Sequence, residues 1–189
     1  MDANAVLDLF RREGALLEGH FRLSSGLHST GYLQCALVLQ HPVHAAALAG
    51  ALAGRAKPAS PTVVLSPALG GVIIGHEVAR ALGVRAIFAE RQDAALVLRR
   101  GFSLGPADRV LVVEDVVTTG KSTRETIEVA RASGATVVGA VAIVDRGGAG
   151  DLGVPAWTLA SVSLPVYEPA TCPQCARAVP VVKPGSRPS

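Results

Sequence analysis

The sequence of 189 residues is poor in the features that mark several large classes of protein. Three cysteines are too few for a disulfide framework, which is consistent with a reducing compartment. Aromatic residues make up only 4% of the chain, too few for a groove that stacks nucleic-acid bases. Charged residues make up 17%, so long disordered or coiled-coil regions are not expected.

Signals for membranes and for secretion are also missing from the sequence. No apolar run reaches the roughly 18–20 residues that a membrane span needs. The first ten residues contain Asp2 and have no basic start before an apolar core, so no signal peptide is visible. The net charge of +3 is too small for the electrostatic footprint of a nucleic-acid binder. We therefore expect a cytoplasmic protein with neither a membrane nor a nucleic acid as partner.

Lysine is scarce, and arginine supplies most of the positive charge. Of the 18 basic residues only Lys57, Lys121 and Lys183 are lysines. Arginine suits planar, bidentate recognition of anions, so ligands with phosphate or carboxylate groups are candidates for this chain. Hydrophobic residues make up 49%, enough for a full core, and the length fits one compact domain.

Apolar strands alternate with helices from about residue 42 to residue 145. The expected helices are 4–12, 42–55, 71–82 and 121–133, and the expected strands are 62–66, 84–89, 109–114, 135–145 and 156–162. Residues 21–35 indicate a hairpin, 90–108 a loop or loose hairpin, and 165–189 an irregular, Pro-rich tail. Continuous apolar strands between helices predict a doubly wound, mostly parallel α/β sheet. Its ligand is expected beyond the carboxyl ends of the strands.

Residues 110–123 place two acids and a hydroxyl-rich loop between a buried strand and a helix. Glu114 and Asp115 end the apolar run, and a Thr-Thr-Gly sequence ends at Gly120. The loop amides and the helix N-terminus can face a phosphate, while the acids can accept ribose hydroxyls or face a metal-bound ligand. A capped helix alone would explain the hydroxyls but not the acids. A P-loop does not fit, because no glycine lies five residues before Gly120.

This order of apolar residues, two acids, two apolar residues and Thr-Thr-Gly resembles the motif of type I phosphoribosyltransferases that binds phosphoribosyl pyrophosphate (PRPP). The resemblance implies that the acids hold the ribose 2′ and 3′ hydroxyls and that the loop amides hold the 5′-phosphate. It implies Mg²⁺ as cofactor, held mainly through PRPP, with no side chain assigned as a direct ligand. The implied PRPP-binding residues are Leu69, Gly70, Arg91, Glu114, Asp115, Val116, Val117, Thr118, Thr119, Gly120, Lys121 and Ser122.

Two further loops are similar to loops of the same family. Residues 66–71, Ser-Pro-Ala-Leu-Gly-Gly, resemble the pyrophosphate loop, in which a cis peptide, here between Ala68 and Leu69, points amides at the diphosphate. A plain glycine turn is the alternative. Residues 90–100 resemble the mobile loop that closes over the diphosphate, often onto a neighbouring subunit. A solvated charged loop is the alternative there.

The family resemblance also implies a catalytic set and an assembly. The mobile loop has no lysine between Arg91 and Arg100, so Arg99 or Arg100 has to neutralise the leaving group. The implied catalytic residues are Glu114, Asp115, Arg99 and Arg100. We expect a homodimer. We also expect a single domain with a core of about residues 40–150 and a hood from about residues 1–40 plus a C-terminal segment.

A Ser-Gly turn at residues 25–26, followed by Tyr32 and Leu33, resembles the N-terminal signature of the orotate phosphoribosyltransferases. These enzymes also carry Asp-Arg where this chain has residues 145–146. The implied orotate-binding residues are Tyr32, Leu33, Thr118 and Arg146. Tyr32 would be the surface for the flat base, and Arg146 would pair with the orotate carboxylate. A surface salt bridge is the alternative for Arg146.

The resemblance implies transfer of the 5-phosphoribosyl group from PRPP to orotate, which gives orotidine 5′-phosphate and diphosphate in pyrimidine (UMP) biosynthesis. A purine phosphoribosyltransferase is the alternative within the class, and Arg146 discriminates against it. A non-catalytic PRPP-sensing regulator is the alternative from another class. The missing loop lysine favours the regulator, whereas the low net charge and the lack of an added DNA-binding segment oppose it.

Cys172 and Cys175 stand at the spacing of metal ligands, in the sequence Cys-Pro-Gln-Cys. One such pair makes a four-ligand zinc site only with Cys35, a histidine or a partner chain. We therefore expect two tail thiols without a metal. His28 is the only histidine in a segment assigned to the site, and the sequence gives it no role.

Overall fold

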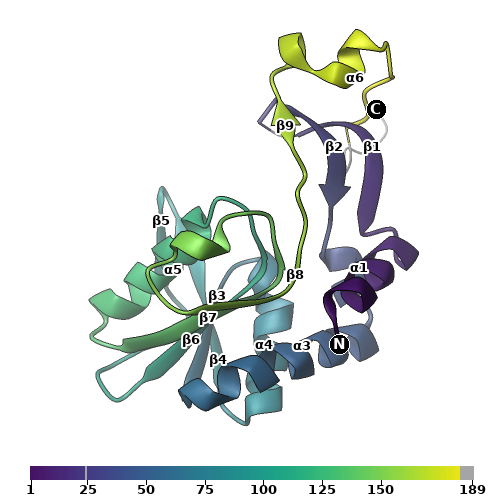
Figure 1. The fold of residues 1–189 in the computed structure, drawn as a ribbon. Coiled ribbons are helices and arrows are strands. Elements are labelled where there is room, and N and C mark those ends of the chain that lie inside the picture. The colour runs from purple at the N-terminus through teal and green to yellow at the C-terminus, as the bar shows by residue number, and fades with distance from the viewer. Residues whose placement is uncertain (24, 184–189) are drawn as a thin grey trace.

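A six-stranded sheet forms the centre of the chain in the computed structural model, which describes residues 1–23 and 25–183 (Figure 1). Its order is β5-β4-β3-β6-β7-β8. The strands are β3 (Val63–Pro67), β4 (Arg85–Gln92), β5 (Ala95–Leu98), β6 (Arg109–Val117), β7 (Thr136–Asp145) and β8 (Ala156–Ser161). The neighbouring strands are parallel except for the β4–β5 hairpin at one edge. The predicted doubly wound, mostly parallel sheet is confirmed.

Helices cover both faces of this sheet. The helices α3 (Pro42–Ala56) and α4 (Gly70–Leu82) pack on one face, with α1 (Ala3–Arg12) against β8, and α5 (Lys121–Ala132) packs on the other. Pro42 suits the first turn of α3, where a backbone N–H has no intrahelical partner. Gly83 ends α4 with a left-handed φ of 72°, as its place in the sequence predicts.

The central strand β6 shows why these strands have no polar alternation. Leu111 and Val113 pack in the cluster beneath α3 and α4, whereas Val110 and Val112 pack in the cluster beneath α5. Both faces are therefore buried, and successive residues serve opposite cores. Truncation of a buried leucine such as Leu111 to alanine typically lowers the free energy of unfolding by about 2–5 kcal/mol.

A smaller three-stranded antiparallel sheet stands beside the central one, and this sheet together with the C-terminal segment 162–183 is called the hood here. The sheet has the order β1-β2-β9, with β1 (Leu16–Arg22), β2 (His28–Leu33) and β9 (Val166–Tyr167). In Figure 1 the yellow C-terminal segment lies beside the purple N-terminal hairpin. The short helices are α2 (Ala36–Leu39), α6 (Pro173–Ala176), η1 (Lys57–Ala59), η2 (Ala149–Asp151) and η3 (Pro169–Thr171).

The prediction of an irregular tail from residue 165 is wrong as far as residue 183. Backbone groups of Val166 and Tyr167 pair with β2, and Val182 bridges to Phe21 of β1. These short pairings come from tertiary contacts and not from local propensity, so a Pro-rich sequence conceals them. Residues 184–189 of the predicted tail lie outside the described residues.

Three other boundaries differ from the sequence expectation. Strand β1 begins at Leu16, where Glu18, Gly19 and His20 break the apolar pattern. Strand β6 runs through both acids to Val117, since this buried end still pairs with β7. Strand β4 runs on to Gln92 instead of ending at Ala89, and with β5 it forms a hairpin, which was one of the two alternatives for residues 90–108. Within the described part of the chain, no helix is long and apolar enough to cross a membrane.

Candidate active site

The acid pair lies in the last residues of β6, at the carboxyl edge of the sheet. Glu114 is 5% exposed and accepts a hydrogen bond of 3.0 Å from Ser122 Oγ. The Oδ1 atom of Asp115 accepts the N–H of Val116 at 2.8 Å. Burial, with the neighbouring Asp115 adding to it, raises the pKa of Glu114 to about 8. Burial also raises the pKa of Asp115.

Neither acid has an ion pair among the described residues. Two adjacent carboxylates without a cationic neighbour favour a ligand that brings hydroxyl donors or a cation to them. Such buried, like-charged pairs with raised pKa values are typical of functional sites.

The loop after β6 is fixed by contacts that require glycine. Gly120 caps α5 with φ 73°, and a Cβ atom there would lie 2.9 Å from the carbonyl oxygen of Gly148. Arg124 donates to the carbonyl oxygen of Thr119 at 2.8 Å and so holds the loop from behind. The residues Thr118 and Thr119 remain exposed, and the first-turn amides of α5 have no intrahelical partners, although that of Lys121 donates to Thr119 Oγ1 at 3.4 Å. This arrangement suits an oxyanion.

The loop after β3 reaches the same edge and rests on the acid pair. The peptide bond between Ala68 and Leu69 is cis, as the resemblance to the pyrophosphate loop implies. A Cβ atom added at Gly70 would lie 2.8 Å from Asp115 Oδ1, so glycine is needed for this approach. Leu69 is 87% exposed. The loop after β3 thus approaches Asp115, while Ser122 beyond the loop after β6 contacts Glu114, so both loops meet the acid pair.

A cavity of about 630 Å³ opens between the loop after β6 and the hood. It combines segments far apart in the sequence, with two threonines of the loop on one side and hood residues on the other. The lining residues are Arg22, Leu23, Ser25, Tyr32, Thr118, Thr119, Arg146, Leu164, Val166 and Lys183.

Arg146 leaves β7 at the wall of this cavity. Its backbone N–H donates to the Val117 carbonyl at 2.8 Å, and its Nη2 donates to the Leu164 carbonyl at 3.2 Å. Its Nε is buried and has no hydrogen-bond partner among the described residues. Burial lowers the pKa of Arg146. The surface salt bridge considered from the sequence does not occur in this part of the chain, since Asp145 instead accepts the amides of Gly147 and Ala149.

Only one of the two hood residues assigned to the orotate base lines the cavity. Tyr32 lines the cavity, with its ring centroid 6.1 Å from that of Phe21. Leu33 packs against the main core cluster and does not line the cavity. Consecutive side chains of a strand point to opposite faces of the sheet. Tyr32 and Leu33 therefore cannot both face the cavity.

The three hairpin arginines are not part of the cavity wall. Arg91 pairs with Glu125 of α5, and Arg100 makes two hydrogen bonds, of 2.9 and 2.8 Å, to Glu90. Arg99 is exposed. The guanidinium of Arg100 lowers the pKa of Glu90. In this conformation the hairpin therefore stands away from the cavity that it is expected to cover.

Sequence reasoning missed five contributors to the cavity, which are Arg22, Leu23, Leu164, Val166 and Lys183. The small number of lysines could have pointed to one of them, since a rare residue type is easily searched for a shared location. Lys121 opens α5 directly after the loop, and Lys183 reaches the cavity from the C-terminal segment. Two of the three lysines in the chain thus border the site.

Comparison with known proteins gives a consistent family. A family model described as the phosphoribosyl transferase domain matches residues 38–152. The orotate phosphoribosyltransferase of Pelotomaculum thermopropionicum is 53% identical over 188 residues, which cover 99% of both chains. That of Carboxydothermus hydrogenoformans is 52% identical over 182 residues, 95% of each chain.

Solved structures agree with these relatives. The crystal structure of orotate phosphoribosyltransferase from Aeropyrum pernix has a TM-score of 0.71 and 31% identity, and the match covers 83% of this chain and 93% of that one. An adenine phosphoribosyltransferase from Thermoanaerobacter pseudethanolicus, at 16% identity and a TM-score of 0.62, shares the fold alone; the match covers 70% of this chain and 88% of that one. The chain belongs to the orotate phosphoribosyltransferase family.

Proposed function

We propose that this chain transfers the 5-phosphoribosyl group of PRPP to orotate and releases orotidine 5′-phosphate and diphosphate, as a step of pyrimidine biosynthesis. The observation that carries the proposal is the guanidinium of Arg146, whose buried Nε–H is unpaired among the described residues, in a cavity bordered by the loop after β6. A buried, unsatisfied donor is costly, and a carboxylate on the base would satisfy it. The 53% identity to the Pelotomaculum enzyme supports the same substrate.

PRPP would lie along the carboxyl edge of the sheet. Glu114 and Asp115 would accept the ribose 2′ and 3′ hydroxyls, and the amides from Thr118 to Ser122 would hold the 5′-phosphate. The amides of Leu69 and Gly70 would face the diphosphate. The closeness of Gly70 to the Asp115 carboxylate supports this layout, because a ribose on the acids would then have its diphosphate beside the loop after β3.

Mg²⁺ fits this donor set. The acids are oxygen donors without a cationic neighbour in the described chain, and Mg²⁺ prefers oxygen ligands together with substrate phosphates. It would be held mainly through PRPP, beside Glu114 and Asp115. When bound, it would neutralise charge that grows on the departing diphosphate.

The residues of the chain would act by positioning and by charge. Tyr32 would support the face of the base, while Arg146 and Thr118 would fix its edge so that the ring nitrogen approaches ribose C1. The C1–oxygen bond to diphosphate breaks through a state that resembles an oxocarbenium ion, and no residue of the chain need act as a nucleophile. Arg99 or Arg100 would stabilise the leaving group once the β4–β5 hairpin closes and excludes water.

We also propose a cytoplasmic homodimer in which the hairpin serves the neighbouring subunit. Arg100 would first have to leave Glu90, an exposed pair worth little in water. Mixing Arg99→Ala/Arg100→Ala chains with Asp115→Asn chains should restore part of the activity in heterodimers. A fully active monomer would contradict this assembly.

One assay tests the reaction itself. Loss of the ultraviolet band of orotate should require both PRPP and Mg²⁺, and adenine, hypoxanthine, xanthine and uracil should be poor substitutes. A preference for a purine would overturn the choice of base. Tight PRPP binding with no turnover of any base would support a PRPP-sensing regulator instead.

A further inference from the structure

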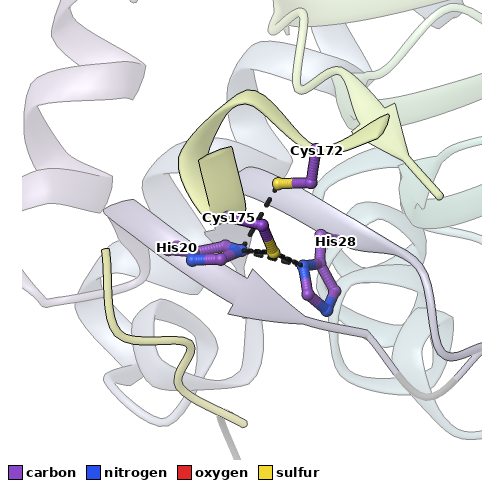
Figure 2. A group of neighbouring side chains, drawn as sticks. All are labelled: His20, His28, Cys172 and Cys175. Atoms are coloured by element: carbon purple, nitrogen blue, oxygen red, sulfur yellow. Dashed lines mark hydrogen bonds between the residues drawn. The ribbon is translucent and has the colours of Figure 1, made fainter. Parts of the chain in front are cut away.

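Four side chains of the hood converge on one point, away from the cavity (Figure 2). His20 comes from β1 and His28 from β2, while Cys172 and Cys175 come from the C-terminal turn around α6. One ligand atom of each lies within 4.8 Å of all the others. His20, His28 and Cys172 are buried and Cys175 is exposed. Residues 152 apart in the sequence thus meet in one cluster.

The distances in the cluster match a tetrahedral zinc site. His20 Nε2 lies 3.4 Å from Cys172 Sγ and 3.7 Å from Cys175 Sγ. His28 Nδ1 lies 3.3 Å from Cys175 Sγ. With Zn–S near 2.3 Å and Zn–N near 2.0–2.1 Å, tetrahedral ligands stand about 3.3–3.8 Å apart. Only the two nitrogens, at 2.8 Å, are closer than this, and a small rotation of one imidazole would separate them.

The second ring nitrogen of His20 is fixed in the way that metal ligands are. Nδ1 lies 2.8 Å from the carbonyl oxygen of Val179. A carbonyl oxygen only accepts, so Nδ1 carries the hydrogen and Nε2 turns its lone pair toward the cluster. Metal-binding histidines commonly donate their other N–H to such a carbonyl, which fixes the tautomer and the ring orientation.

A cross-link of this kind would stabilise the hood. Its sheet has three strands, one of them only two residues long, and its interior places two histidines where larger sheets place aliphatic side chains. A sheet of this size buries too little apolar surface to be stable alone, and small units commonly rely on a disulfide or a structural metal.

We propose that His20 Nε2, His28 Nδ1, Cys172 Sγ and Cys175 Sγ bind one structural zinc ion. Two thiolates and two imidazoles form a closed tetrahedral set with no open position, which is typical of structural zinc and unsuited to Mg²⁺. The proposal departs from the expectation of unligated tail thiols, because the hairpin supplies the two ligands that the cysteine pair lacks.

The zinc ion would hold the C-terminal segment at the cavity. Beyond the cluster, the N–H of Val182 donates to the His20 carbonyl and the N–H of Arg22 donates to the Val182 carbonyl, both at 2.8 Å. The next residue, Lys183, lines the cavity beside Arg22. Loss of zinc should therefore disorganise one wall of the cavity. This consequence rests on the proposed function, whereas the metal site does not.

Metal content tests the site directly. The full chain, freed of any affinity tag and purified from zinc-supplemented medium, should carry about one equivalent of zinc by elemental mass spectrometry. Cys172→Ser, Cys175→Ser, His20→Asn and His28→Asn should each lower that content several-fold. The matched controls Cys35→Ala and His76→Gln should retain it, since these residues lie outside the cluster. A parent chain that stays free of zinc after incubation with Zn²⁺, or that binds another metal instead, would overturn the proposal.

Two measurements on the parent chain remain informative if a variant fails to fold. Replacement of zinc by Co²⁺ should give the visible bands of tetrahedral cobalt and a near-ultraviolet thiolate charge-transfer band. Removal of zinc by a chelator should lower the thermal midpoint by several degrees, and Zn²⁺ but not Mg²⁺ should restore it. A thermal midpoint that does not change with Zn²⁺, together with an absorption spectrum that does not change with Co²⁺, would contradict the proposed site. Zinc binding without orotate turnover would instead contradict the proposed function alone.

Discussion

The central sheet and the hood of this chain are stabilised in different ways. Strand β6 buries side chains on both faces, so Leu111 and Val112 each belong to a separate apolar cluster. The hood has a sheet of three short strands and buries two histidines of that sheet together with Cys172 of the C-terminal segment. The sheet holds the carboxylates that would face the sugar phosphate, while the hood supplies Tyr32 and Lys183 to the cavity. The rigid part would thus bind the substrate common to the wider family, and the weaker part would face the base.

The largest effect is expected on the side of the sheet. Glu114→Gln and Asp115→Asn each remove a charged acceptor for a ribose hydroxyl, worth about 1.5–3 kcal/mol. The double variant should lower kcat/KM for PRPP roughly 10²–10⁴-fold while the fold is kept. Steady-state kinetics and circular dichroism would measure both. Wild-type efficiency in the double variant would show that the acids do not bind PRPP.

A smaller loss is expected where the two loops meet. Gly70→Ala would place a Cβ atom 2.8 Å from Asp115 Oδ1 and push the loop away from the carboxylate. We expect roughly a tenfold rise in KM for PRPP, since the misplaced loop loses about one hydrogen bond to a charged group. The control is Gly50→Ala in α3, where an added Cβ atom meets nothing within 4 Å. Equal KM values for the two variants would remove the loop from the PRPP site.

The smallest effect concerns stability and pH. Folding raises the pKa of Glu114 from 4.5 to about 8, so the stability that this group contributes is full below pH 4.5 and is lost as the pH rises through 8. Glu114→Gln should therefore match the parent near pH 5 and melt higher at pH 9, by about 2–4 °C for each kcal/mol relieved.

Thermal melts without Mg²⁺ and PRPP would measure this difference. The control is Glu128→Gln, which removes the same charge from an exposed position. A parallel pH response in both variants would mean that Glu114 is an ordinary carboxylate.

Sequence reasoning succeeds in the central sheet because local pattern and tertiary environment agree there. Strands buried on both faces are apolar throughout, and the loops that follow them carry the polar residues. The elements from residue 42 to residue 161 could therefore be predicted, apart from η1, β5 and η2. The cis bond at Ala68–Leu69 could be expected only from the family resemblance. The acids extend the strand beyond its apolar part, so the end of β6 at Val117 was set three residues too early.

The hood resists the same reasoning because distant contacts create it. Strand β9 has two residues, and it forms through the pairing of Val166 and Tyr167 with β2. His20 lies in strand β1, whose apolar pattern is broken by Glu18 and Gly19. The histidine partners of the cysteine pair could therefore not be found from sequence spacing. The register of β2 decides that Tyr32 and not Leu33 lines the cavity.

The choice of base is the central claim, and Arg146→Ala tests it most directly. Loss of the guanidinium should lower kcat/KM for orotate at least about a hundredfold, or about 2.7 kcal/mol. PRPP affinity measured by calorimetry without base should barely change, because no phosphate contact is lost. A variant that uses orotate as well as the parent, or that loses PRPP binding to the same extent, would contradict the assignment of Arg146 to the orotate carboxylate.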